Sequence, residues 1–493
     1  MLTNLFSSDL FRRNVFLVLD ELAAYISDSE IKGLPFSIPD SLLKAAASLM
    51  AKEETGDICV AEEKIRKIIQ LYIKTGIQVY SPGYMGRQFS GVVPLAGVID
   101  FVSSMVSQPS SFYEAAPLPN VVEHLMAEEL NQFIGWPSDS YAMVTTSGGS
   151  LATMTAMLAA RNDKYPQFWS QGTVGLQGLR PAVAVGADVH YSVQRAVGIL
   201  GIGEDQIVRL PLNEKKQIDV DKVPVILDAS LQSGLDLFCM VASAGTTSTG
   251  AFDPLDALAD IAASRKIWLH VDGAHGASLL VSDKLRHRLA GINKADSFSW
   301  DAHKTMFVPA VCTLLFYKNK AKSYGAFQQE ASYVFEKKEE EYTAYESAKQ
   351  NFECTKRPLI MSLWVLWAVY GRQLFAEKIE YLCQLTHDVW RFLQEQSDIE
   401  VLHKPECNIL CFRYIPKELA ASGITLADFQ LAIRNQLTRE GKFFISKVDI
   451  DGVTALRVVF MNHTIDISHV NMLLAEIRRV GNALLVKKQF FFK

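Results

Sequence analysis

The feature that most constrains the fold is a long alternation of short apolar runs and amphipathic stretches between Tyr141 and Lys318. The runs are YAMVTT, AVAVGAD, QIVRLPL, FCMVASAG, IWLHVDG, SFSWD and VCTLLFYK. Nearly continuous apolar strands separated by helices are typical of a mostly parallel sheet that is buried on both faces. We therefore expect an α/β fold whose ligands bind beyond the carboxyl ends of the strands.

Two regions of different pattern flank this predicted sheet. Residues 1–110 carry helical periodicity, as in VFLVLDELAAYI and AEEKIRKIIQLYIKTG, and predict an N-terminal helical segment without a core of its own. Residues 111–374 contain the predicted sheet. Residues 375–493 combine short apolar runs with helical stretches, which predicts a small α+β domain. A chain of 493 residues is long enough for two or three such units.

Composition excludes several classes of protein. Hydrophobic residues make up 49% of the chain and charged residues 21%, which is typical of a globular protein. The formal net charge of −5 does not suit the phosphate backbone of a nucleic acid, so we expect no nucleic-acid partner. The longest apolar run, residues 358–371, is shorter than the roughly 18 residues of a membrane span, so we expect no membrane partner.

The first residues and the cysteines both favour a cytoplasmic location. The N-terminal stretch does not resemble a signal peptide, because its arginines follow apolar residues and because Asp20 and Glu21 interrupt the apolar run. The seven cysteines are scattered and include no CxxC pair, which fits a reducing compartment. Cys407 and Cys411 lie in an apolar, strand-like run, so we interpret them as core thiols and expect no metal site.

Five of the predicted strands end in residues with unusual chemistry. Ser-Gly-Gly-Ser at 147–150 opens a helix, where backbone N–H groups can bind an anion. His190 and Thr246 follow two further strands, while Asp272 and Lys304 end the strands IWLHV and SFSWD. Each of these residues has an ordinary alternative as part of a tight turn, a helix cap or a salt bridge.

Taken together, the five strand ends form the equipment of a site for pyridoxal 5'-phosphate. The helix start would bind the phosphate, and His190 supplies an aromatic ring that can stack on the cofactor. Asp272 would keep the ring nitrogen protonated, since a buried carboxylate needs a cationic partner. Lys304 would form a Schiff base with the aldehyde.

These segments resemble the group II pyridoxal-dependent amino acid decarboxylases, which include glutamate, aromatic amino acid, cysteine sulfinate and diaminobutyrate decarboxylases. The matching stretches are YMGRQFSG (84–91), TTSGGSLATMTAMLAARN (145–162), DVHYSVQRA (188–196), SAGTTSTGAFDPL (243–255), WLHVDGAHGAS (268–278), DSFSWDAHKTMFVPAVC (296–312), ECTKRPLIMSLW (353–364) and ALRVVFMNHT (455–464). They occur in family order over most of the chain. The HKTxFxP part is most similar to diaminobutyrate-type members.

The resemblance implies a fold-type I large domain and the conversion of an L-amino acid into its amine and carbon dioxide, through an external aldimine and a quinonoid. It also implies a homodimer with a shared active site. Two alternatives remain open on the same scaffold. One is a different pyridoxal enzyme, which forms an aldehyde or cleaves another carbon–carbon bond, and the other is a non-catalytic regulatory paralogue.

The resemblance also assigns roles to single residues. Lys304 would carry the cofactor, Asp272 would pair with its ring nitrogen, and His190 and Ala274 would contact its two faces. Thr246 would lie close to the ring. The phosphate would be held by Gly149, Ser150 and His303.

The substrate side is assigned more coarsely. Gln88 and Phe89 are expected near the substrate, and Arg457 contributes either to the substrate side or to local structure. Tyr342 is the first candidate for a loop tyrosine that returns a proton to the substrate, and Tyr345 is the second. The charged stretch at 328–349 that carries both tyrosines is interpreted either as a solvated segment or as a lid.

Two segments depart from the family pattern. Asp301 stands where many members have asparagine, which changes the hydrogen bonding beside Lys304. Thr355, Lys356 and Arg357 replace the usual Gly-Arg-Arg, so that one arginine has become a lysine. The two cations are not equivalent where planar, bidentate contacts matter.

Overall fold

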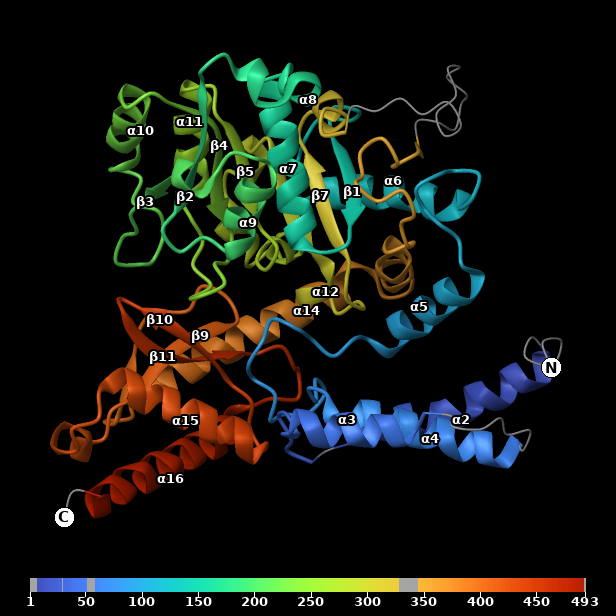
Figure 1. Ribbon diagram of the computed structural model, residues 1–493, viewed down its shortest axis with the longest axis vertical. Helices are drawn as coiled ribbons and strands as arrows, with labels where there is room; N and C mark the ends of the chain where they lie inside the picture. The colour runs from blue at the N-terminus through green and yellow to red at the C-terminus, as the bar shows by residue number, and fades with distance from the viewer. Residues whose placement is uncertain (1–6, 29, 51–57, 328–344, 492–493) are drawn as a thin grey trace. The chain divides into compact units, whose positions relative to one another are not determined.

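The computed structural model describes residues 7–28, 30–50, 58–327 and 345–491 (Figure 1). The chain divides into two compact units. The large unit comprises Gln88–Thr386 and His403–Ile409, and the small unit comprises Met1–Arg87, His387–Leu402 and Leu410–Lys493. The three-part division expected from the sequence stays a prediction.

A seven-stranded sheet forms the centre of the large unit, in the order β1-β7-β6-β5-β4-β2-β3. Its strands are β1 (Ala142–Thr146), β2 (Arg180–Gly186), β3 (Ile207–Leu210), β4 (Leu235–Ser243), β5 (Trp268–Asp272), β6 (Ser297–Asp301) and β7 (Thr313–Tyr317). The strands from β2 to β6 run parallel, while β7 runs antiparallel to both β1 and β6. All seven apolar runs are therefore strands, and the prediction of a mostly parallel sheet is confirmed.

The helices of the large unit alternate with these strands along the chain. They are α5 (Pro94–Val106), α6 (Pro117–Asn131), α7 (Gly149–Lys164), α8 (Phe168–Gln171), α9 (Tyr191–Ile199), α10 (Val223–Gln232), α11 (Leu255–Ser264), α12 (Ala302–Thr305), α13 (Lys320–Ser323) and most of α14 (Ile360–Gln394). Helix α7 crosses the sheet and packs against β4, β5, β6 and β7 (Figure 1). Its face toward the sheet is rich in small residues such as Ala152, Ala156 and Ala159, all buried, which lets the helix lie close to the strands.

The small unit contains a four-stranded sheet in the order β10-β11-β9-β8. Its strands are β8 (Ile399–Val401), β9 (Ile409–Tyr414), β10 (Ser446–Ile450) and β11 (Val453–Val459), and its helices are α2 (Ser8–Ser27), α3 (Pro39–Ser48), α4 (Ile58–Thr75), α15 (Leu426–Glu440) and α16 (Ile467–Phe491). Helices α2 and α3 bury none of their described residues. Among the described helices, none is long and apolar enough to cross a membrane.

Candidate active site

The ends of three neighbouring strands bring the first site residues together. In the pairing of β4, β5 and β6, Asp272 lies opposite Ser243 on one side and Ser299 on the other. The Asp272 carboxylate accepts hydrogen bonds from the Ala274 backbone N–H at 3.2 Å and from the Ser299 hydroxyl at 3.4 Å. These are neutral donors, so the carboxylate keeps capacity for a cationic partner.

Lys304 lies on the short helix α12, directly after β6. Its Nζ is 3.0 Å from Oδ2 of Asp301, whose side chain is 3% exposed, and the Thr313 hydroxyl donates to the other carboxylate oxygen at 2.5 Å. His303 is buried beside the same carboxylate, with its Nε2 atom 3.7 Å from Oδ2 of Asp301. The amine of Lys304 is thus held by a buried carboxylate at the place where the sequence predicted a reactive lysine.

The start of α7 lies against the same group of residues. Gly148 has a φ of 101°, a conformation that residues with a side chain rarely adopt. A Cβ atom on Gly149 would lie 3.1 and 3.2 Å from the two carboxylate oxygens of Asp301, and 3.5 Å from the Cβ of Ala274. The absence of a side chain at Gly149 therefore allows the backbone of α7 to approach the ends of β5 and β6. Ser150 follows in the first turn and is exposed.

His190 is the N-cap residue of α9. Its Nδ1 atom lies 2.8 Å from the Ser192 hydroxyl, which fixes the orientation of the ring. Burial lowers the pKa of His190, Asp272 opposes this shift, and Lys304 adds to it. Both charged groups therefore lie close enough to the imidazole to affect its protonation.

Thr246 belongs to the turn that follows β4. It is 5% exposed, and its hydroxyl oxygen accepts the Ala251 N–H at 3.1 Å and lies 3.1 Å from the Thr249 hydroxyl. These contacts hold the turn in a fixed shape at the same edge of the sheet.

The residues predicted for the substrate side belong to both units. Gln88 begins the large unit, and its Nε2 atom is buried without a hydrogen-bond partner in the described part of the chain. Phe89 is 47% exposed. Arg457 lies on β11 in the small unit, where its guanidinium donates to the Ser446 hydroxyl at 3.0 Å.

The structure describes one of the two candidate loop tyrosines. Tyr342 lies outside the described residues. Tyr345 is described, and its ring lies 5.2 Å from that of His124 and 6.3 Å from that of Tyr113.

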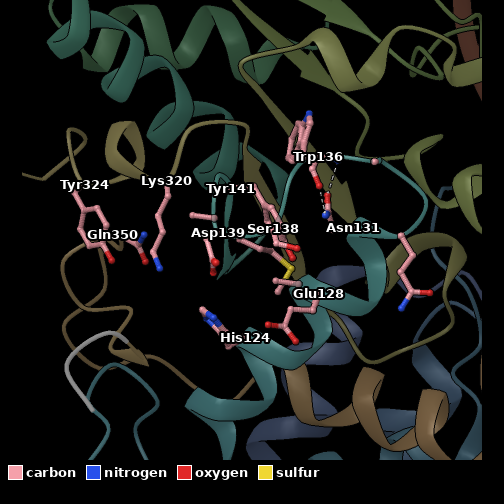
Figure 2. A pocket seen from close by; sticks show the side chains of 15 residues that line it. His124, Glu128, Asn131, Trp136, Ser138, Asp139, Tyr141, Lys320, Tyr324 and Gln350 are labelled. Atoms are coloured by element: carbon pink, nitrogen blue, oxygen red, sulfur yellow. Dashed lines mark hydrogen bonds between the residues drawn. The ribbon is translucent and has the colours of Figure 1, made fainter. Parts of the chain in front are cut away.

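A separate pocket of about 530 Å³ lies beside α6 and the start of β1, and Figure 2 shows the side chains of His124, Glu128, Asp139 and Lys320 around it. None of the residues predicted for the cofactor lines this pocket. The strand ends, where a lysine, two aspartates and a histidine meet, are therefore the better candidate for catalysis.

The sequence interpretation missed Glu123, which forms a buried ion pair with Lys356 next to the end of β1. The only signal was on the other partner, because Lys356 stands where the family usually has arginine. Glu123 itself lies on a helix with other glutamates, Glu128 and Glu129, and nothing in the sequence distinguishes it from them.

Comparison with known proteins agrees with this geometry. Residues 46–415 match the family model described as the pyridoxal-dependent decarboxylase conserved domain. The sheet, with a lysine and an aspartate at its strand ends, is that of a fold-type I pyridoxal enzyme. The chain belongs to the pyridoxal-dependent decarboxylase family, so it is a carboxy-lyase and its cofactor is pyridoxal 5'-phosphate.

Solved structures share the whole fold. Mouse CSAD is 24% identical with a TM-score of 0.87, and the match covers 96% of this chain and 98% of that one. A tryptamine-bound Oryza sativa TDC is 21% identical with a TM-score of 0.87, covering 97% and 99%. The glutamate decarboxylase domain of a Vibrio parahaemolyticus diaminobutyrate-pyruvate transaminase and L-2,4-diaminobutyrate decarboxylase is 20% identical with a TM-score of 0.83, covering 97% and 96%. The prediction of the fold and of the family is confirmed.

Proposed function

We propose that this protein removes the α-carboxylate of an L-amino acid as carbon dioxide and releases the corresponding amine. The observation that supports the proposal is that Asp272 ends β5 while His190 and Lys304 follow β2 and β6, all parallel strands of one sheet, and that the glycine start of α7 lies against Asp301 beside Lys304. A primary amine held by a buried carboxylate, with a second carboxylate nearby, suits a cofactor that has an aldehyde and a basic ring nitrogen.

The residues fit the cofactor at each of its functional groups. Lys304 would hold the aldehyde carbon, Asp272 the ring nitrogen, and the backbone of Gly149 and Ser150 the phosphate, with His303 beside it. The bare backbone at Gly149 supports this assignment, because any side chain there would press against Asp301. When bound, the cofactor supplies an electron sink for the pair of electrons that carbon dioxide leaves behind.

The side chains around the cofactor would control protons. Asp272, as a carboxylate, would keep a proton on the ring nitrogen. Burial lowers the pKa of His190, which favours the neutral imidazole, and a neutral ring can stack on a cationic ring without repulsion. Ala274 would contact the opposite face, and Thr246 would fix the turn beside the ring. Tyr342 would return the proton to the substrate carbon.

The remaining parts of the proposal come from the family resemblance. We propose a homodimer with a shared active site, in which residues 1–110 form the dimerising segment, and a cytoplasmic location. Gln88, Phe89 and Arg457 would contact the substrate. The buried amide nitrogen of Gln88 supports this role, since a buried donor without a partner is suited to bind a polar group of a ligand.

The decisive experiment is a substrate panel on the purified enzyme loaded with cofactor. The panel contains diaminobutyrate, ornithine, lysine, glutamate, aspartate, cysteine sulfinate and aromatic amino acids, and products are detected by mass spectrometry. We expect carbon dioxide and an amine from one class of substrate. Aldehyde with hydrogen peroxide would favour the aldehyde-forming alternative, and a Rhodiola rosea 4-hydroxyphenylacetaldehyde synthase shares the fold. Bound cofactor without carbon dioxide from any substrate would contradict the proposal.

A further inference from the structure

A network of buried polar groups holds the last residues of β1. This strand lies at the end of the sheet, with β7 as its neighbour, so its other edge would leave backbone groups without a strand to pair with. At Thr145 side chains take the place of the missing strand. The Thr145 N–H donates to Oε1 of Glu123 at 2.8 Å, and the Thr145 hydroxyl donates to Oε2 at 2.9 Å.

The other half of the network comes from the segment that precedes α14. The Asn351 amide donates to the Thr145 carbonyl at 3.2 Å, in the amide orientation that satisfies its neighbours. The Nζ atom of Lys356 lies 3.1 and 3.0 Å from the two oxygens of Glu123, and 2.9 Å from the amide oxygen of Asn351. All three ammonium protons of Lys356 therefore have an acceptor. We call Glu123, Thr145, Asn351 and Lys356 the β1 clasp.

Stability alone does not account for this clasp. Lys356 is fully buried and Glu123 is 6% exposed, so both charges lose their hydration. Replacing a buried ion pair with apolar side chains of similar size is often neutral or stabilising, because desolvation offsets most of the attraction. A buried ion pair does fix the geometry of the segments that carry it, since its partners must keep one arrangement to remain hydrogen-bonded.

The clasp lies where its fixed geometry can control the exit of β1 into α7. Thr145 is followed by Thr146, where β1 ends, and then by Ser147, Gly148 and Gly149, with which α7 begins. Ser147 is tied to the same segment, because its hydroxyl donates to Glu353, three residues before Lys356. The chain is thus anchored on both sides of Thr146, immediately before the turn into α7.

The segment that carries Lys356 is itself fixed. The Ser110 N–H donates to the Lys356 carbonyl at 2.7 Å, and the Lys356 N–H donates to the Ser111 hydroxyl at 3.2 Å. The backbone at Lys356 is therefore held in place. A change of its side chain should shift the position of Thr145 and not the backbone around Lys356.

We propose that Glu123 and Lys356 are positioning residues for the phosphate of the cofactor. By fixing the exit of β1, the clasp sets the direction in which the backbone N–H groups of Gly149 and Ser150 point. This inference rests on the proposed assignment of these two residues to the phosphate. The geometry of such N–H groups matters, because hydrogen bonds weaken steeply as they depart from linearity.

The test compares the binding of pyridoxal 5'-phosphate with that of pyridoxal, which lacks the phosphate. Both are titrated into apoenzyme well below its melting temperature, and the visible absorbance of the bound form gives each Kd. In Lys356→Met we expect the Kd of pyridoxal 5'-phosphate to rise by about tenfold or more, the equivalent of one charged hydrogen bond. The Kd of pyridoxal should change by less than about twofold, because pyridoxal has no phosphate and the clasp is not proposed to position its other contacts.

Two variants separate positioning from mere stability. Lys356→Arg keeps a cation that can reach Glu123, and should restore most of the preference for the phosphorylated form. Leu437→Ala removes a buried side chain of α15 in the small unit, so it lowers the melting temperature without touching the clasp. Its preference for the phosphorylated form should equal that of the wild type. If Lys356→Met does not fold, Glu123→Gln tests the same point, since it keeps the size of the side chain.

The outcomes are distinguishable. A folded Lys356→Met variant with the wild-type ratio of the two dissociation constants would overturn the positioning role, whether both affinities are unchanged or both fall equally. A wild-type enzyme that binds pyridoxal as tightly as pyridoxal 5'-phosphate would instead overturn the assignment of Gly149 and Ser150 to the phosphate. Absence of binding by both ligands in the wild type would contradict the proposed function itself.

Discussion

Gln430 in the small unit and Asp301 in the large unit are both buried polar residues, yet their partners differ in kind. Gln430 is fully buried, and its amide accepts the Tyr414 N–H at 3.0 Å and donates to the Tyr414 carbonyl at 2.8 Å. Asp301 is 2% exposed and faces the amine of Lys304 at 3.0 Å. The partners of Gln430 are neutral backbone groups, whereas the partners of Asp301 include the amine of Lys304. Burial of a polar group is thus not in itself a mark of a site, whereas pairing with an ionisable group at a strand end is.

Removing the amine of Lys304 should have the largest effect. In Lys304→Ala we expect the release of carbon dioxide to fall to background, because the variant lacks the amine that is proposed to hold the aldehyde of the cofactor. Release is measured with the best substrate of the panel. Lys318→Ala, at an exposed lysine next to β7, is the control and should keep wild-type activity. Substantial turnover by Lys304→Ala would show that the amine beside Asp301 is not needed for the reaction, and that its pairing does not mark a catalytic site.

Neutralising Asp272 should have the next largest effect. In Asp272→Asn we expect kcat to fall by about 10²–10⁴-fold, the usual range for a group that controls a proton. The melting temperature should change little, because the amide oxygen can still accept the Ala274 N–H that lies 3.2 Å from Asp272. Steady-state kinetics and thermal melting measure the two effects on the same samples. A large loss of stability with unchanged kcat would place Asp272 in the same class as Gln430.

Gln430 should show the opposite pattern. In Gln430→Ala the buried N–H and carbonyl of Tyr414 both lose their partner, so we expect the free energy of unfolding to fall by about 1–3 kcal/mol. The kcat of the folded enzyme should remain within about twofold of the wild-type value, which corresponds to less than 1 kcal/mol. Urea denaturation gives the stability, and Gln436→Ala on the same helix is the control, with an expected change within about 0.5 kcal/mol. A drop in kcat that exceeds the loss of folded protein would break the comparison.

Asp253 lies between the two cases, since it is ionisable but has neutral partners. Its carboxylate accepts the N–H groups of Ile218 and Ser243, each at 2.7 Å, and burial raises its pKa to about 7. The folded chain therefore holds a proton that the unfolded chain has released above about pH 4. Stability from this residue is present below pH 4 and is lost as the pH rises toward 7.

The effect of Asp253 can be measured in the pH dependence of the free energy of unfolding. We expect its contribution to lower the free energy of unfolding by less than about 1.4 kcal/mol per pH unit in this window, and Asp253→Asn to flatten the slope. Denaturation at a series of pH values from 4 to 8 checks this. An identical slope in the variant would mean that Asp253 is ionised in the folded chain throughout the window.

The sequence predicted the parts of the fold and of the site that have local signals. Each strand of the large sheet coincides with one of the short runs recognised in the sequence; Asp272 ends one of these strands, and Lys304 comes three residues after the end of another. The order of the strands, with β7 antiparallel between β1 and β6, depends on contacts between distant parts of the chain that no local pattern encodes. Glu123 could not be recognised for the same reason. Which glutamate of α6 faces β1 is decided by the packing of the helix, and the partner at Lys356 is far away in sequence.

The β1 clasp also bears on the solubility of the protein. An edge strand with free N–H and carbonyl groups is a template on which a strand of another molecule can assemble, and this is a common start of aggregation. At Thr145 the backbone N–H donates to Glu123 and the carbonyl accepts from Asn351. Neither group is therefore available to pair with an incoming strand. A variant that opens the clasp should therefore also be watched for the growth of oligomers during concentration and storage.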